Sequence, residues 1–241
     1  MSLKFVECTL GVKYRFINSE GRIFGGPMNY LRYGLEKRNM RGLGKFLAGL
    51  FAVLGVGASF GGGNMLQSNQ AFKIVSAIFN GALSADALKG GFIGVLIIGL
   101  QRAAFSSEAG VGSAAIAHSA SKTNNPIADG FASLVEPFID TMVVCTMTAL
   151  VLIFTGMHEV NGLGGVELTS DAFGSVISWF PAVLAFAVFL FAFSTMVSWS
   201  YYGMRSWTYL FGRSKESEII YKVMFLIFVV LGASASLGAV L

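Results

Sequence analysis

The chain has 241 residues, of which 54% are hydrophobic and only 12% are charged, and its formal net charge is +4. A soluble domain carries about 25% charged residues, so this composition excludes an ordinary soluble protein and indicates that lipid surrounds much of the chain. Nine of the 17 Lys and Arg residues precede residue 46 and are interleaved with glycines and aromatics, so the positive charge does not indicate nucleic-acid binding.

The first 45 residues are predicted to be a cytoplasmic amphipathic segment of a single transmembrane domain covering 1–241. Its opening stretch, "MSLKFVECTLGVKYR", carries charges at positions 4, 7, 13 and 15, which interrupt any apolar core of a signal peptide. We interpret it as the end of a helix or an interfacial helix. The basic residues before the first apolar run place it in the cytoplasm by the positive-inside rule.

Five membrane helices are predicted. Four apolar runs of about 19 to 23 residues can each cross a hydrocarbon core of about 30 Å; they are 46–66, 138–156, 181–203 and 223–241. The fifth segment, 90–118, begins with an apolar run of only about 12 residues, too short to cross alone. The alternation of basic and acidic loops requires this segment to cross once, which predicts one discontinuous helix. The alternative is a short re-entrant helix that ends in an ordinary loop.

The predicted interruption is "FSSEAGVGSAA", residues 105–115. Unpaired backbone groups are costly in hydrocarbon, so an unwound stretch at membrane depth has to face protein, water or a ligand. Free amides near Gly110 suit a substrate carboxylate, and carbonyls near Phe105 and Ser106 suit a small cation. Glu108 lies inside the break; we favour a structural role for it, because a free carboxylate there would repel the substrate's own.

The other polar residues form no pattern typical of an enzyme or a resident cofactor. Glu136, Asp140 and His118 are interpreted as interfacial or capping groups near helix ends, and His158 lacks metal-ligand spacing. The two cysteines, Cys8 and Cys145, are expected to be small buried hydrophobes. We therefore predict that the protein is not an enzyme.

Five stretches in chain order resemble the alanine or glycine:cation symporter family: "FGGPMNYLRYGL", "GGGNMLQSNQ", "RAAFSSEAGVGSAAIAHSA", "EPFIDTMVVCTMTALVLIFTG" and "FAFSTMVSWSYYG". The resemblance covers nearly the whole chain. It implies an all-α membrane protein of the cell (inner) membrane with a partial leucine-transporter-type fold and about five membrane helices, one of them discontinuous. In that fold a small amino acid and sodium bind near the midplane between two inverted repeats.

The resemblance also implies site residues. Substrate contacts fall on Gln67, Phe105, Ser106 and Trp199, joined by the amide of Gly110, and hydroxyl ligands for sodium fall on Ser194 and Thr195. Simpler interpretations exist: the two hydroxyls can bond carbonyls of their own helix, Trp199 can belong to an interfacial belt, and Gln67 can cap a helix.

The sequence departs from the family pattern at the first, fourth, fifth and tenth helices, for which we find no counterpart. The stretch between Gln67 and Gly90 is too short and polar to span even once. Two hypotheses follow: sodium-coupled symport of alanine or glycine, or a truncated, internally deleted membrane protein without transport of its own. A third, a channel or interaction subunit, rests only on the glycine-rich face at 55–63, which more often indicates tight helix packing. Oligomeric state is left open.

Overall fold

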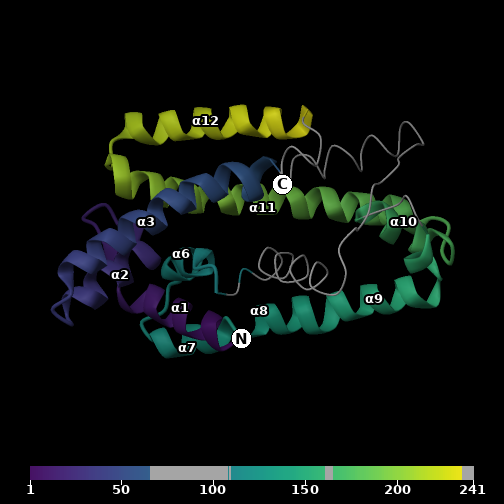
Figure 1. The fold of residues 1–241 in the computed structure, drawn as a ribbon, viewed down its shortest axis with the longest axis horizontal. Helices are drawn as coiled ribbons and strands as arrows, with labels where there is room; N and C mark the ends of the chain where they lie inside the picture. Colours follow the sequence, from purple (N-terminus) through teal and green to yellow (C-terminus); the bar gives the residue numbers. More distant parts are fainter. Residues whose placement is uncertain (66–107, 109, 161–164, 235–241) are drawn as a thin grey trace.

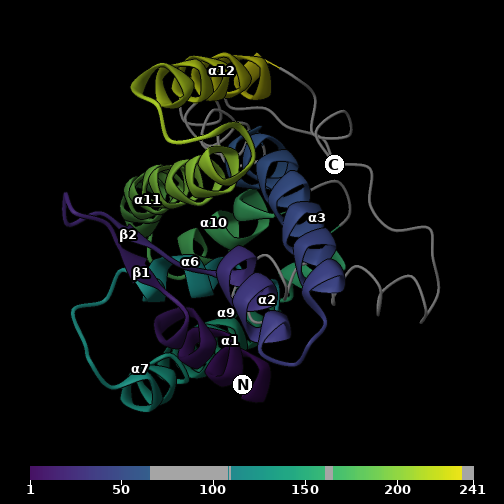
Figure 2. The same cartoon turned by 90° about the vertical axis from the view of Figure 1, so that its left-hand side faces the viewer.

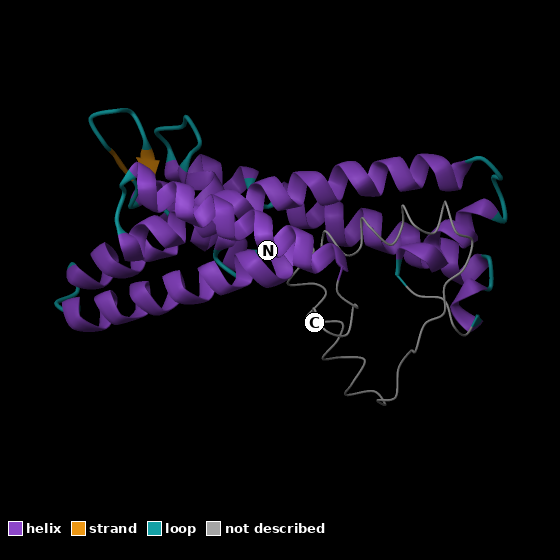
Figure 3. Ribbon diagram, turned by 90° about the horizontal axis from the view of Figure 1, so that it is seen from above, coloured by secondary structure: helices purple, strands orange, loops and turns teal. Residues whose placement is uncertain are grey.

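The computed structural model describes residues 1–65, 108, 110–160 and 165–234. These ranges are helical except for loops and one two-stranded hairpin, as expected of an all-α membrane protein. Most of the short helices gather at one end of an elongated bundle, and longer helices extend along its long axis (Figures 1 and 3).

Helix α1 (Ser2–Lys13) packs against two short helices, α6 (Ser113–Ser119) and α7 (Pro126–Ala132). Its buried side includes the charged residues Lys4 and Glu7 as well as Cys8 and Val12. This differs from the expected interfacial helix, whose buried face would be apolar. The charges can be buried because Glu136 of α8 (Val135–Pro137) pairs with Lys4 and the amide of Gly110, before α6, donates to Glu7.

A hairpin of β1 (Phe16–Ile17) and β2 (Ile23–Phe24) follows α1. Its turn is stabilised by Asn18, whose Oδ1 accepts hydrogen bonds from the amides of Glu20 (3.1 Å) and Arg22 (2.7 Å). Such Asn side chains close tight turns by replacing a backbone acceptor. Phe16 pairs with Phe24 across the hairpin, and their rings stack at 5.2 Å between centroids.

Helix α2 (Pro27–Glu36) starts with proline in its first turn, where no amide is needed. It ends at Glu36, and Asn39, which adopts a φ of 60°, lies in the turn that leads into α3 (Arg41–Phe60). The helix then continues as a π-helical turn, η1 (Gly61–Met65). Together Arg41–Met65 are long and apolar enough to cross a membrane.

The next candidate span, Pro126–Phe154, is a series of helical pieces. Asn125 caps its start by accepting from the amides of Ile127 and Ala128. After α7 come α8 (Val135–Pro137), a π-helical stretch η2 (Phe138–Val144) and α9 (Cys145–Phe154). A short 3₁₀ turn, η3 (Met157–Glu159), ends this part of the chain.

The C-terminal part contains α10 (Val166–Gly174), α11 (Phe180–Phe211) and α12 (Lys215–Ser234). The last two complete the four candidate spans among the described residues. Helix α11 runs eight residues beyond the predicted end at 203, because its last two turns pack on α3 and the hairpin rather than ending at the aromatic belt. Helix α12 begins eight residues before the predicted start at 223, since its polar first turns bond to α11 through Trp207 Nε1 and Ser217 Oγ (2.9 Å).

Helices α3, α11 and α12 pack closely through small residues (Figure 2). A Cβ added to Gly63 would lie 2.2 Å from Cγ of Trp199, and one added to Gly203 would lie 2.1 Å from the hydroxyl oxygens of Ser59 and Tyr221. Those two hydroxyls bond each other at 3.0 Å. The predicted glycine-rich face therefore packs helices, as small residues do in membranes.

Candidate functional site

Within the predicted interruption, the described residues that precede position 113 are not helical. Glu108, Gly110 and Gly112 all have positive φ angles, of 52°, 89° and 91°. A regular α-helix cannot contain such residues, and for Glu108 the conformation is unusual enough to suggest a functional constraint. Helix α6 begins immediately afterwards at Ser113. The N-terminal part of the predicted 90–118 helix, through residue 107, lies outside the described residues.

The carboxylate of Glu108 is held inside the protein. Its Oε2 accepts a hydrogen bond from Oγ of Ser113 at 2.6 Å, and it also interacts with the side chain of Trp199. Glu108 thus has two side-chain partners, Ser113 at the start of α6 and Trp199 on α11.

The amide of Gly110, which we predict to bind a substrate carboxylate, faces a carboxylate of the protein itself. It donates to Oε1 of Glu7 at 3.3 Å. Burial raises the pKa of Glu7, while the amides of Gly110 and Gly112 and the ammonium of Lys4 oppose this rise. Glu7 was missed at the sequence level; its only signal is a lone glutamate among apolar residues of α1.

A chain of ionic contacts extends from α1 to the next span. Lys4, 3% exposed, lies with Nζ 2.8 Å from Oε2 of Glu136. Nε2 of His118 is 3.5 Å from the other oxygen of Glu136, and Nδ1 of His118 is 2.9 Å from Asp129. These contacts tie α1, α6, α7 and α8 together.

Trp199 forms a wall beside the interruption. It is 6% exposed, packs its ring on the backbone of Gly63 in η1, and meets Tyr202 edge-on at 5.6 Å. The structure thus brings Trp199 near Glu108, two neighbours that are 91 positions apart in sequence. Its part in substrate binding stays a prediction.

The two predicted sodium ligands lie one turn earlier on α11. Thr195 donates its hydroxyl hydrogen to the carbonyl of Phe191 at 2.9 Å, the within-helix bond expected from the simpler interpretation. That bond leaves the oxygen lone pairs of Thr195 available to a cation. Ser194 is exposed, so no close protein neighbour covers its side chain among the described residues. The remaining predicted contacts, Gln67, Phe105 and Ser106, lie outside the described residues.

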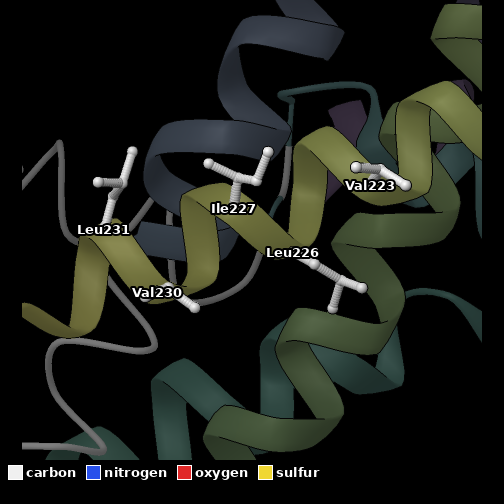
Figure 4. A pocket seen from close by; sticks show the side chains of 5 residues that line it. All are labelled: Val223, Leu226, Ile227, Val230 and Leu231. Carbon is white, nitrogen blue, oxygen red and sulfur yellow. The ribbon is translucent and has the colours of Figure 1, made fainter.

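Other surfaces of the described chain suit a zwitterion less well. An apolar groove is lined by α12 alone (Figure 4), by Val223, Leu226, Ile227, Val230 and Leu231. It offers no polar side chain to an ammonium or carboxylate group. Cys8 is buried as predicted, whereas the expectation is wrong for Cys145, which is exposed on α9.

Comparison with known proteins assigns the chain to a family of transporters. The family model described as the sodium:alanine symporter family matches residues 1–77 and 70–241. The sodium/alanine symporter AgcS of Methanococcus maripaludis is 31% identical over the whole chain, which spans 67% of AgcS. The probable sodium/glutamine symporter GlnT of Bacillus subtilis is 31% identical over 79% of the chain and 40% of its own length. The sodium/proton-dependent alanine carrier of Bacillus sp. strain PS3 is 30% identical over 64% of the chain and 38% of its own length.

The alignment with AgcS is longer than the chain itself. It runs over 308 positions, whereas the chain has 241 residues, so at least 67 positions of the aligned region have no residue here. At 1.5 Å per residue, about 67 residues are enough for two membrane helices with their loops. The family model matches in two pieces that overlap at residues 70–77, and the loss of the fourth and fifth helices stays a prediction. The chain spans about two thirds of the length of AgcS and belongs to the sodium:alanine symporter family.

Proposed function

We propose that the protein carries a small neutral amino acid, alanine or glycine, into the cell together with sodium across the inner membrane. The observation that carries the proposal is the non-helical backbone of Glu108 and of residues 110–112, beside Trp199 of α11, in a member of a symporter family. An interrupted helix of this kind supplies the polar backbone groups that a zwitterion needs inside a membrane.

In the proposed mechanism, the substrate carboxylate accepts a hydrogen bond from the backbone N–H of Gly110. Glu7 accepts that N–H in this structure, so substrate binding requires the Glu7 carboxylate to move away or to become protonated. Trp199 limits the size of the substrate side chain, because the ring is fixed against Gly63 and Tyr202. A methyl group or a hydrogen fits such a bounded site better than a long side chain.

Sodium is treated as co-transported substrate in this proposal. Thr195 offers it a hydroxyl oxygen whose hydrogen already points to Phe191 O, so the oxygen can accept a cation without rearranging the helix. Each sodium ion that enters contributes about 2.3 kcal/mol per 100 mV of membrane potential. That is enough to drive uphill uptake of a neutral amino acid.

Uptake by the purified 241-residue chain in proteoliposomes tests the proposal. We expect labelled alanine or glycine to accumulate with an inward sodium gradient, more than glutamine does and more than with a proton gradient alone. Thr195→Val should raise the sodium concentration that gives half-maximal uptake by about tenfold. A tenfold change corresponds to the loss of about 1.4 kcal/mol of binding free energy, which we assign to one sodium ligand. Thr148→Val is the matched control, because Thr148 makes the same within-helix bond, to Val144 O at 3.0 Å, on α9.

Alanine and glycine uptake that ignores the sodium gradient would reject the proposal. Equal effects of the two threonine substitutions would reject Thr195 as a sodium ligand while leaving the symport activity in place.

A second candidate is a membrane protein that does not transport by itself. The 67 unmatched positions favour it, because a carrier built from two inverted repeats requires both repeats to be complete. A chain that is folded and monodisperse in detergent but shows no uptake in proteoliposomes would support this candidate. Robust sodium-dependent uptake by residues 1–241 alone would exclude it.

A further inference from the structure

Two arginines share one aromatic ring where α11 meets the hairpin. The guanidinium carbon of Arg205 lies 4.8 Å from the centroid of Phe24, and that of Arg213 lies 4.0 Å from the same centroid. Each guanidinium also lies close to a second ring, Arg205 to Tyr201 at 4.8 Å and Arg213 to Phe16 at 4.6 Å. Two positive groups are therefore held within about 9 Å of each other by their aromatic neighbours.

This positive charge lacks a neutralising carboxylate. Neither Arg205 nor Arg213 makes an ion pair in the part of the chain that the structure describes, and Nε of Arg205 is buried there without a hydrogen-bond partner. Glu218, in the first turn of α12, already forms an ion pair with Arg22 at 2.9 Å. Ring stacking satisfies the guanidinium faces but leaves their N–H groups, which lie at the edges, available to an acceptor.

The two arginines line a small pocket between the hairpin, the start of α2 and the end of α11. Its other lining residues include Gly25, Asn29 and Thr208, and none of the described residues that line it is acidic. Arg213 is exposed, whereas Asn29 and Thr208 are buried. Planar guanidiniums in such a setting match the paired oxygens of a phosphate group.

The position in the membrane selects the source of that phosphate. Arg205 lies two residues, about 3 Å along the helix, beyond the end of the apolar run 181–203, and we therefore assign it to the headgroup layer. Phe211, 62% exposed, lies beside this region and can enter the same interface. Basic residues at this end of α11 and α12 place it on the cytoplasmic side, where anionic lipids concentrate.

We propose that Arg205 and Arg213, stacked on Phe24, bind the phosphate of an anionic phospholipid of the cytoplasmic leaflet. A bound lipid at this point bridges the hairpin and α11, and so stabilises the junction between the N-terminal segment and the C-terminal helices.

Native mass spectrometry of the purified 241-residue chain tests this proposal in detergent containing equal amounts of phosphatidylglycerol and phosphatidylcholine. We expect the wild type to retain phosphatidylglycerol preferentially, and Arg205→Gln/Arg213→Gln to lose that preference by at least about tenfold, the value of one charge-assisted hydrogen bond. Because Arg213 is exposed, Arg213→Gln alone is the variant least able to disturb folding, and it should lose part of the preference. Arg38→Gln/Lys45→Gln removes the same charge at exposed positions and should retain it.

Equal retention of the two lipids by the wild type would overturn the proposal, as would equal losses in the site variant and the charge-matched control. Millimolar inorganic phosphate is added in a separate arm. If it displaced phosphatidylglycerol completely, the site would bind a soluble anion, and the lipid assignment would be wrong.

Discussion

At the residue scale, Glu7 links the start of the chain to the interruption more than 100 positions away. A buried carboxylate that accepts only one or two amide hydrogen bonds loses more by desolvation than it regains, which is why burial raises its pKa. Folding therefore favours the protonated form of Glu7. The contribution of Glu7 to the free energy of unfolding is fully present below the ordinary carboxylate pKa, and it is lost as the pH rises through the raised pKa of the folded state.

Glu7→Gln removes this titration. We expect wild-type thermal stability in detergent to fall as the pH rises above about 4.5, the ordinary pKa of the group, while the variant falls less over the same interval. Glu20→Gln, at a carboxylate 70% exposed in the hairpin, is the control and should follow the wild type. Parallel pH profiles for Glu7→Gln and the wild type would show that Glu7 does not titrate as described.

Arg15 holds the loop after α6 by its guanidinium. It donates to the carbonyls of Ser119 (3.0 Å), Ser121 and Thr123 (2.6 Å), which lie at and beyond the end of α6. Cationic side chains at a helix C-terminus donate hydrogen bonds to the free carbonyls and are attracted to the negative end of the helix dipole.

Arg15→Ala should lower the free energy of unfolding by about 2 kcal/mol, since several hydrogen bonds to a charged group are lost at a partly buried site. Chemical denaturation in detergent measures this, with exposed Arg38→Ala as the control. A change in Arg15→Ala no larger than that of the control would mean that solvent replaces these bonds without cost.

At the scale of elements, the contact between α3 and α11 depends on the absence of side chains. The sequence predicts tight packing from the glycines at 55–63, yet it cannot tell which glycine faces the partner helix, because that depends on the π-helical turn in η1. Gly63 contacts Trp199, whereas an added Cβ at Gly57 would meet nothing within 4 Å.

Gly63→Ala should therefore destabilise the protein by about 1 to 3 kcal/mol, as overpacking does, and should also displace the Trp199 ring. Gly57→Ala should be neutral or stabilising by about 0.5 to 1 kcal/mol, because alanine favours a helix interior. Thermal unfolding monitored by tryptophan fluorescence measures both effects. Similar melting temperatures for the two variants would contradict the packing described for η1.

At the scale of the whole molecule, sequence patterns predicted the apolar spans better than the connections between distant segments. Long apolar runs indicate membrane helices, because the thickness of the hydrocarbon layer sets the length of such a run. The burial of Lys4, the bonds of Arg15 and the stacking of Arg205 on Phe24 join residues more than 100 positions apart. No local periodicity encodes such pairs. The family resemblance supplied candidate site residues, all of which stay predictions, and Gln67, Phe105 and Ser106 lie outside the described residues.

The predicted topology can be tested with single cysteines in a variant whose natural Cys8 and Cys145 are replaced by alanine. A membrane-impermeant maleimide added to intact cells should label His158→Cys, in the predicted outside loop, and should label Ser214→Cys only after the cells are opened. Ala185→Cys, buried within α11, is the unlabelled control. Labelling of Ser214→Cys in intact cells would reverse the orientation assigned from the basic residues.

Helix α11 has one mechanical consequence. Its 32 residues form a rod about 48 Å long, roughly half as long again as the hydrocarbon layer it crosses. Pivoting such a rod by about 10° around its centre swings each tip by about 4 Å in opposite directions. When such a pivot widens the gap between one tip of α11 and a neighbouring helix on one side of the bilayer, it narrows the gap at the other tip on the opposite side.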